Sequence, residues 1–356
     1  MKNTIAKLVL EDDSVFEGYS FGSKKTTKGE VVFNTGMVGY PESLTDPSYK
    51  GQILVLTYPL IGNYGIPGYE KEDELLKYFE SGKIQIQGLI ITDYSDNYSH
   101  WNAKKSLSDW MKEHDIPGIY NIDTRELTKK LRKKGTLLGK IIYNKKDDTG
   151  FEDPNKRNLV AEVSITKPIV YKRGKKRILL VDCGTKNNII RAFIKRDFTV
   201  IRVPWDYNFL NEKVDGIVLS NGPGDPKKCK DTIKYVREAL AGKTPILGIC
   251  LGSQILGLAA GASTFKLKYG HRSHNQPCVE TGTNRCYITP QNHGYAVKSE
   301  TLPEDWREWF YNNNDNTNEG IIHISKPFFG TQFHPEASPG PDDTEFLFDM
   351  FIRSIK

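Results

Sequence analysis

The chain of 356 residues is 38% hydrophobic and 26% charged with a net charge of +6, a globular composition that excludes an intrinsically disordered protein. Its length favours two domains, and no apolar run is long enough to cross a membrane, so no membrane partner is expected. Five cysteines, an odd number without a C-x-x-C pair, argue against a disulfide framework or a zinc ribbon and predict a cytoplasmic location.

Residues 1–145 alternate short strand-like runs with turns and are predicted to form a smaller N-terminal α/β domain. The first ten residues contain Lys7 and lead into an acidic triplet, which predicts a strand and a turn rather than a secretory signal. A helix is expected to begin at the capping-box-like run Asp123-Thr124-Arg125-Glu126 and to end at Gly135.

Two basic clusters, residues 129–134 and 172–177, supply much of the positive charge. They are compatible with nucleic-acid binding or with a solvated helix end and a linker. We favour the second interpretation because cations in the last turn of a helix complement its dipole without any ligand. The sequence therefore predicts no nucleic-acid partner.

Residues 146–176 are charged and contain Asn and Pro, so they are predicted to be a linker. The C-terminal domain, residues 177–356, has a different pattern, in which short apolar segments alternate with segments of helical spacing. The apolar segments are predicted to be buried strands: 178–181, 199–203 and 216–219. This alternation predicts an open, mostly parallel α/β sheet with helices on both faces. Such sheets bind their ligands at the carboxyl ends of the strands.

A glycine-rich loop, Asn221-Gly222-Pro223-Gly224, follows the third of these strands. It lacks the Lys-Ser/Thr pair of a phosphate-binding loop, so nucleotide binding on this chain is not expected. Close approach of the backbone to a small substrate explains the glycines better.

The most informative segment is Gly248-Ile249-Cys250-Leu251-Gly252, which ends an apolar run and precedes a helix-like segment. Its spacing is that of a nucleophile elbow with sulfur in place of oxygen. A thiol at a helix N-terminus is favoured as the thiolate, which is the nucleophile. The N–H of Leu251 would point at the oxyanion that forms when the sulfur attacks a carbonyl.

The run His271-Arg272-Ser273-His274 has metal-like spacing. No nearby cysteine or carboxylate completes a ligand set, so we predict a loop and no metal site. His293 lacks an acidic partner in the sequence and is expected to have a positional role.

The segment His334-Pro335-Glu336 supplies a base and an orienting carboxylate within three residues. Proline favours an extended conformation, in which side chains at i and i+2 share one side. A cysteine nucleophile needs such a pair, so Cys250, His334 and Glu336 are the predicted catalytic residues.

These motifs resemble those of the triad, or class I, glutamine amidotransferases, which implies a flavodoxin-like amidotransferase domain at residues 177–356. Further stretches are similar to the small, glutaminase subunit of carbamoyl-phosphate synthetase: 33–37, 44–49, 58–65, 219–226, 291–296 and 334–341. The first three belong to a domain that sister amidotransferases lack.

The resemblance implies that glutamine is hydrolysed through a Cys thioester and that ammonia passes to a large subunit, which makes carbamoyl phosphate for arginine and pyrimidine biosynthesis. A heterodimer is expected, with ATP and Mg on the large subunit and no cofactor on this chain. The resemblance also implies that Gly222 N–H is a second oxyanion donor and assigns a glutamine site that includes one residue of the other domain: Ser48, Gly222, Gly224, Leu251, Gln254, Asn292, Gly294 and Tyr295.

Two alternatives remain open. The chain could be the glutaminase component of another synthetase, against which the first 145 residues argue. It could also be a non-catalytic regulatory subunit, but retention of Cys250, His334 and Glu336 argues against that.

Overall fold

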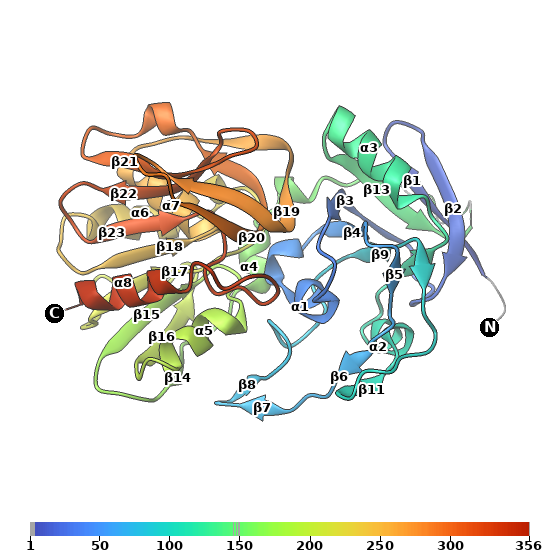
Figure 1. Cartoon of the computed structure of the whole chain (residues 1–356), viewed down its shortest axis with the longest axis horizontal. Helices are drawn as coiled ribbons and strands as arrows, with labels where there is room; N and C mark the ends of the chain where they lie inside the picture. The colour runs from blue at the N-terminus through green and yellow to red at the C-terminus, as the bar shows by residue number, and fades with distance from the viewer. Residues whose placement is uncertain (1–3, 145, 147, 149, 356) are drawn as a thin grey trace. The chain divides into compact units, whose positions relative to one another are not determined.

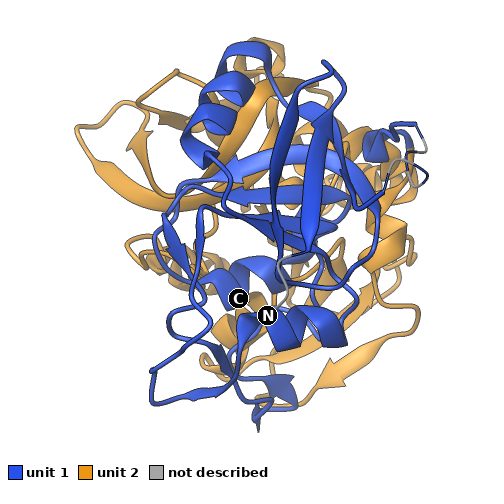
Figure 2. Ribbon diagram, turned by 90° about the vertical axis from the view of Figure 1, so that its right-hand side faces the viewer, with its two compact units in different colours: residues 1–156 blue, residues 157–356 orange. Residues whose placement is uncertain are grey.

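The computed structural model describes residues 4–144, 146, 148 and 150–355. The chain forms two compact units, residues Met1–Lys156 and Arg157–Lys356 (Figure 2). The predicted end of the first domain at residue 145 lies outside the described residues.

Unit 1 is built on a closed barrel whose strands follow the order β1-β13-β3-β4-β9-β12-β2. The neighbours β3, β4, β9 and β12 run parallel, and the other pairings are antiparallel. The seven strands have these bounds: β1 Ile5–Leu10, β2 Val15–Ser20, β3 Thr27–Asn34, β4 Gln52–Leu56, β9 Gly88–Ile90, β12 Gly118–Tyr120 and β13 Leu137–Ile142.

The helices of unit 1 are short, and hydrogen bonds accepted by N-cap side chains determine where α2 (Leu107–Glu113) and α3 (Thr124–Lys134) begin. The predicted helix is confirmed as α3 (Thr124–Lys134), where the Asp123 carboxylate accepts the N–H of Glu126 at 2.8 Å. The other elements are α1 (Tyr40–Thr45), η1 (Pro47–Tyr49), α2 (Leu107–Glu113), η3 (Pro154–Lys156) and three two-stranded pairs, β5 (Leu60–Ile61) with β10 (Asp93–Tyr94), β6 (Ile66–Pro67) with β11 (Ala103–Lys105), and β7 (Lys71–Glu72) with β8 (Leu75–Leu76).

Unit 2 contains a ten-stranded sheet of order β14-β16-β15-β17-β18-β23-β22-β21-β19-β20. The central strands from β16 to β23 are parallel, as the strand–helix alternation predicts, and the side from β22 to β20 is antiparallel. The bounds are β14 Ile169–Tyr171, β15 Arg177–Asp182, β16 Thr199–Pro204, β17 Gly216–Leu219, β18 Ile246–Ile249, β19 Thr264–Glu280, β20 Cys286–Val297, β21 Trp306–Asn312, β22 Asn318–His323 and β23 Phe328–Thr331.

Helices cover both faces of the parallel half (Figure 1). Successive side chains of a strand point to opposite faces of the sheet, so both faces are apolar and both need a cover. On β23, Phe328 packs in the core with residues of α6 and α7, whereas Phe329 contacts Phe351 of α8. The helical elements of unit 2 are α4 (Leu159–Val163), α5 (Asn187–Ile194), η4 (Pro226–Lys228), α6 (Lys230–Ala239), α7 (Leu251–Ala260), η5 (Ser299–Thr301) and α8 (Phe346–Ser354).

The segment predicted as a linker, residues 146–176, carries more structure than expected. The boundary between the units falls within it, at residues 156 and 157. Beyond that boundary, α4 adds Val160 to the core of unit 2, and β14 pairs antiparallel with β16 at the edge of the sheet. The charged composition of residues 146–176 predicted no such elements, because the apolar segments of α4 and β14 are short.

None of the described helices is both long and apolar enough to span a membrane.

The packing of α5 against α8 gives a stability prediction. Phe193 is fully buried and meets Phe348 and Phe351 edge-on, with ring centroids 5.3 and 6.0 Å away. We expect Phe193→Ala to lower the free energy of unfolding by about 3–5 kcal/mol, because it leaves a cavity between two helices. Chemical denaturation measures this loss, and Phe346→Ala, at a position 41% exposed, is the control that should change it far less. Equal losses in both variants would contradict the assigned packing.

Candidate active site

Cys250 occupies a tight turn between β18 and α7, as the elbow motif predicts. Its backbone has φ 54° and ψ −107°, a conformation that residues with a side chain rarely adopt. The turn brings α7 against its neighbours so closely that a Cβ on Gly252 would lie 2.1 Å from the carbonyl oxygen of Leu219. Glycine is therefore required beside the cysteine, and the strained turn presents the thiol at the carboxyl end of the sheet.

His334 and Glu336 follow β23, the strand that pairs with β18. His334 Nδ1 lies 2.6 Å from Glu336 Oε1, so the predicted contact between the two side chains is present. The predicted extended conformation is wrong, however, since Pro335 and Glu336 form a turn in which the N–H of Ala337 donates to the carbonyl of His334. The turn, rather than an extended backbone, brings the side chains together.

Lys186 is a member of this cluster that the sequence motifs did not reveal. It precedes α5 after β15, and its Nζ lies 3.1 Å from Glu336 Oε1. Both side chains are almost completely buried. A buried carboxylate needs compensation of its charge, and Lys186 and His334 provide it from two sides. The only signal in the sequence was a lysine following the end of a predicted strand.

The charges of this cluster set the protonation of His334. Burial acts to lower the pKa of His334, but the charge of Glu336 and the nearby Cys250 outweigh it and raise the pKa to about 10. For Glu336, burial acts to raise the pKa, whereas Lys186 and His334 lower it to about 2. The imidazole therefore holds its proton firmly, and Nδ1–H is fixed toward the carboxylate.

Strand β20 and the segment that follows β23 complete the surroundings of the sulfur. The thiol of Cys250 donates to the backbone carbonyl of Asn292 at 3.7 Å, and Gln332 Nε2 donates to the sulfur at 3.6 Å. Gln254 Nε2 donates to the carbonyl of Tyr295 at 2.8 Å and to Gln332 Oε1 at 3.0 Å. Its Oε1 is buried and has no partner among the described residues. Gln254 thus ties α7 to β20 and leaves one acceptor facing the site.

The loop after β17 brings backbone close to the elbow. A Cβ on Gly222 would lie 2.8 Å from Leu251 Cδ2 and 2.1 Å from the carbonyl oxygen of Cys183, so only glycine fits. Gly224 has φ 81°, which also favours glycine. Gly294 lies on β20 between Asn292 and Tyr295.

The structure therefore gathers in unit 2 every predicted site residue except one. Ser48 lies in η1 of unit 1, where it is buried and its N–H donates to Asp46 Oδ1 at 2.9 Å. Its predicted contact with glutamine stays a prediction.

The prediction for residues 271–274 is wrong, because they lie within β19 and not in a loop. His271 is also close to acidic groups that are distant in sequence, Glu319 and Asp315, and to His293. Local spacing could not reveal these partners, which strand pairing supplies.

Two different family models match this chain, one in each of the two units. The model of the class-I glutamine amidotransferase family matches residues 179–354. The model of the carbamoyl-phosphate synthase small chain, CPSase domain, matches residues 8–141. A carbamoyl phosphate synthase arginine-specific small chain of Saccharomyces cerevisiae is 50% identical over 99% of this chain and 89% of its own length. The chain belongs to the carbamoyl-phosphate synthase small-chain family.

Other members of this family in the comparison are longer. Multifunctional protein CAD of Squalus acanthias is 55% identical over 99% of this chain, which corresponds to 16% of that protein. The human mitochondrial protein named carbamoyl-phosphate synthase [ammonia] is 50% identical over the whole chain, 24% of its own length. The chain spans only about a fifth of the length of the multifunctional relatives it matches. The predicted family and fold class are confirmed.

The pKa values of the cluster give a prediction for Glu336→Gln. Without the carboxylate, burial and the charge of Lys186 act against protonation, so the pKa of His334 should fall well below about 10. Protonation of His334 stabilises the wild-type fold fully below its ordinary pKa of 6.5, and this stabilisation is lost as pH rises through about 10. The difference in unfolding free energy between the two proteins should therefore narrow from pH 6.5 to pH 10.

NMR titration of the histidine side chains measures the pKa directly, and denaturation at several pH values measures the stability difference. Glu345→Gln is the control, because this partly exposed carboxylate pairs with Arg196 and not with His334. An unchanged pKa of His334 in Glu336→Gln would contradict the assigned coupling.

Proposed function

We propose that this chain hydrolyses L-glutamine to glutamate and ammonia, with Cys250 as nucleophile, His334 as acid and base, and Glu336 as the group that orients His334. The observation that carries the proposal is that a buried His–Glu pair, which follows the strand adjacent to β18, lies beside the strained elbow cysteine. Neither feature alone requires this chemistry, but together they supply the nucleophile, the base and the orienting carboxylate of acyl transfer.

In the proposed reaction, Cys250 gives its thiol proton to His334, and Sγ attacks the side-chain carboxamide carbon of glutamine. The N–H groups of Leu251 and Gly222 donate to the oxyanion that develops on the carbonyl oxygen. His334 protonates the amide nitrogen, the C–N bond breaks, and ammonia leaves a γ-glutamyl thioester on Cys250. His334 then accepts a proton from water, whose oxygen attacks the thioester carbon, and glutamate departs as the thiol is restored.

The raised pKa of His334 fits the first half of this cycle, in which the imidazole must hold a proton for the leaving ammonia. Because Glu336 is held ionised by Lys186 and His334, it supports the charged imidazolium through both steps. Lys186 is therefore a positioning residue in this proposal.

The glutamine site is proposed to comprise residues that surround the elbow, together with Ser48 from unit 1: Ser48, Gly222, Gly224, Leu251, Gln254, Asn292, Gly294 and Tyr295. The free Oε1 of Gln254 supports its part, since it is a buried acceptor suited to an ammonium or amide N–H.

The family supports a wider role in which ammonia passes to a large-subunit partner that makes carbamoyl phosphate from bicarbonate and ATP. We propose a heterodimer with that subunit, a cytoplasmic location, and no cofactor on this chain, with ATP and Mg bound by the partner. One similar protein is named as arginine-specific, which supports a role in arginine biosynthesis beside the pyrimidine pathway.

A second possibility is that the chain serves a synthase that uses free ammonia, as the name of one relative specifies for that protein. Family membership alone therefore does not identify the nitrogen donor. The buried Lys186–Glu336–His334 cluster beside Cys250 favours glutamine hydrolysis, because a purely structural unit has no use for a paired base facing a thiol.

Cys250→Ser is expected to reduce glutamine hydrolysis by orders of magnitude while leaving the fold intact, because the hydroxyl is a far weaker nucleophile at this elbow. Release of glutamate, measured in the assembled enzyme, tests this. Synthesis of carbamoyl phosphate from added ammonia should persist and is the internal control. Normal glutamine turnover by the variant would refute the mechanism.

Ser48→Ala tests the contribution of unit 1. If its hydroxyl binds the charged end of glutamine, KM should rise roughly ten-fold and kcat should change less, as for one lost hydrogen bond to a charged group. Ser43→Ala, at another buried serine of unit 1, is the matched control and should leave KM unchanged. An unaltered KM in Ser48→Ala would confine the glutamine site to unit 2.

A further inference from the structure

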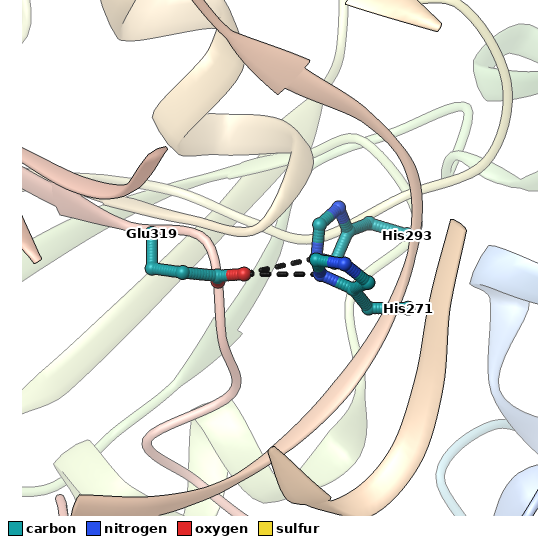
Figure 3. Close-up of side chains that lie close together, drawn as sticks. All are labelled: His271, His293 and Glu319. Carbon is teal, nitrogen blue, oxygen red and sulfur yellow. Dashed lines mark hydrogen bonds and ion pairs between the residues drawn. The ribbon is translucent and has the colours of Figure 1, made fainter. Parts of the chain in front are cut away.

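A second cluster of titratable side chains lies in the antiparallel half of unit 2. His271 on β19, His293 on β20 and Glu319 on β22 point toward one another (Figure 3). All three are buried, with side chains 8%, 2% and 0% exposed. One ligand atom from each lies within 4.8 Å of the others. Three strands thus deliver two imidazoles and a carboxylate to one point.

Each imidazole has one ring nitrogen that contacts an acceptor outside the cluster, and this contact determines which nitrogen carries the proton. His271 Nε2 lies 2.9 Å from Asp315 Oδ2, so it donates there and leaves Nδ1 toward Glu319 Oε1 at 3.1 Å. His293 Nδ1 lies 2.8 Å from the backbone carbonyl of Tyr295, so Nδ1 donates and Nε2 is left with a lone pair. When His271 is neutral and donates through Nε2, both rings direct an acceptor nitrogen inward.

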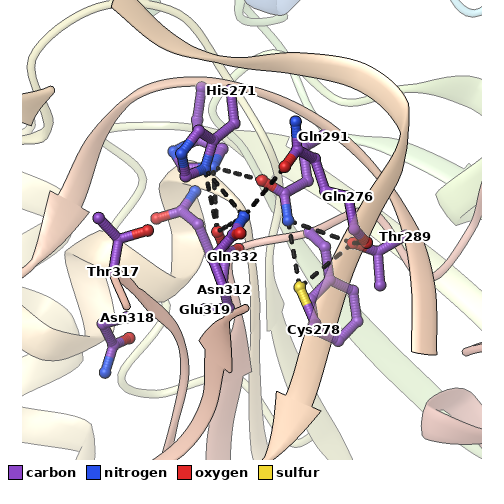
Figure 4. Close-up of polar contacts among 12 residues, drawn as sticks. His271, Gln276, Cys278, Thr289, Gln291, Asn312, Thr317, Asn318, Glu319 and Gln332 are labelled. Atoms are coloured by element: carbon purple, nitrogen blue, oxygen red, sulfur yellow. Dashed lines mark hydrogen bonds and ion pairs between the residues drawn. The ribbon is translucent and has the colours of Figure 1, made fainter. Parts of the chain in front are cut away.

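Gln291, Cys278 and Thr289 belong to a network of polar contacts beside His271 and Glu319 (Figure 4). Gln291 Oε1 lies 3.1 Å from His293 Nε2, and Glu319 Oε1 lies 3.8 Å from it. As the Gln291 amide lies in the structure, its Nε2 donates to Cys278 Sγ at 3.2 Å and to Thr289 Oγ1 at 3.1 Å. In this orientation an imidazole lone pair and two oxygens meet without a proton to share.

Glu319 reinforces this imbalance. Its Oε1 accepts from Asn312 Nδ2 at 3.3 Å, but Oε2 is buried and has no hydrogen-bond partner among the described residues. The carboxylate is thus only partly compensated, and a buried carboxylate in this condition calls for a cation.

We propose that His271, His293 and Glu319 form a binding site for a divalent transition-metal ion, of which zinc is the best match. Two imidazole nitrogens and one carboxylate oxygen are a zinc ligand set. Bonds of about 2.0–2.1 Å at tetrahedral angles separate ligand atoms by about 3.3 Å, near the 3.1 and 3.8 Å observed here. Gln291 Oε1 is placed to serve as a fourth ligand.

The outer partners support the same assignment. Histidine ligands of metals donate their second ring N–H to a carboxylate or a backbone carbonyl, which are the roles of Asp315 and the carbonyl of Tyr295.

The rival arrangement is an imidazolium at His271, held by two carboxylates without a metal. Burial lowers the pKa of His271, but Asp315 and Glu319 outweigh burial and raise it to about 10. This proton accounts for the contacts of His271. It leaves unexplained why the lone pair of His293 Nε2 faces Gln291 Oε1 and Glu319 Oε1, which a metal between these atoms explains.

The site lies behind the proposed glutamine pocket and is structural in its role. Strand β20 carries His293 together with Asn292 and Tyr295, whose carbonyls contact Cys250 and Gln254. The carbonyl of Glu319 accepts the N–H of Gln332, which also contacts the sulfur. A metal at this point would fasten β19, β20 and β22 and so hold the pocket wall in place.

Metal binding is measured on the full chain after removal of bound metal with a chelator. We expect one equivalent of Zn²⁺ to bind and to raise Tm, and Co²⁺ to give the d–d absorption of a site with nitrogen and oxygen ligands, without sulfur-to-cobalt charge transfer. The measurements are made in a Cys250→Ser background so that the elbow thiol does not bind the ion.

Glu319→Gln should weaken Zn²⁺ binding by at least about 100-fold, and Asp315→Asn, which alters only an outer partner, by about 10–100-fold. Asp315 is half-exposed, so this variant should fold and keeps the test valid if Glu319→Gln does not. His274→Gln, a neighbouring histidine outside the cluster, is the matched control and should bind like wild type. No stoichiometric metal and no shift in Tm, or a cobalt spectrum of thiolate ligation, would overturn the proposal and leave the proton-held arrangement.

Discussion

The buried charge cluster of Lys186, Glu336 and His334 is the interaction on which the proposed chemistry depends. Glu336 is completely buried and would be costly to ionise alone, yet two cations from different elements make ionisation favourable. The carboxylate then fixes the imidazole at Nδ1 and leaves Nε2 for Cys250. Removing either cation would leave a buried charge without full compensation, so the three side chains act as one unit.

The parallel half of the sheet brings the parts of the site to one edge. Strands β15, β17, β18 and β23 are followed respectively by Lys186, Gly222, Cys250 and His334. Carboxyl ends of adjacent parallel strands meet at the same edge, so Lys186 and Glu336, 150 positions apart in the sequence, form an ion pair there. The antiparallel half adds the wall formed by β20, which the second cluster of His271, His293 and Glu319 supports from behind.

Sequence reasoning located what depends on local pattern and missed what depends on strand pairing. The strands of the parallel half, α3 with its Asp123 cap, and the Cys250 elbow follow from short-range rules about spacing, caps and glycine. Lys186 and the His271 cluster could not be found in this way, because their partners lie 22 to 150 residues away and pair only once the sheet forms. Pro335 was misleading as well, since proline fits a turn as readily as an extended segment.

The pairing of β18 with β23 has a consequence for how this half of the chain can vary. The N–H of Cys250 donates to the carbonyl of Thr331 at 2.7 Å, so nucleophile and base are separated by one ladder of backbone hydrogen bonds. The number of residues between α7 and β23 therefore does not affect the distance between Cys250 and His334. Insertions at the exposed hairpin tip, residues 281–285, can accumulate during evolution, and engineers can fuse tags or reporters there, without altering the spacing of the reacting groups.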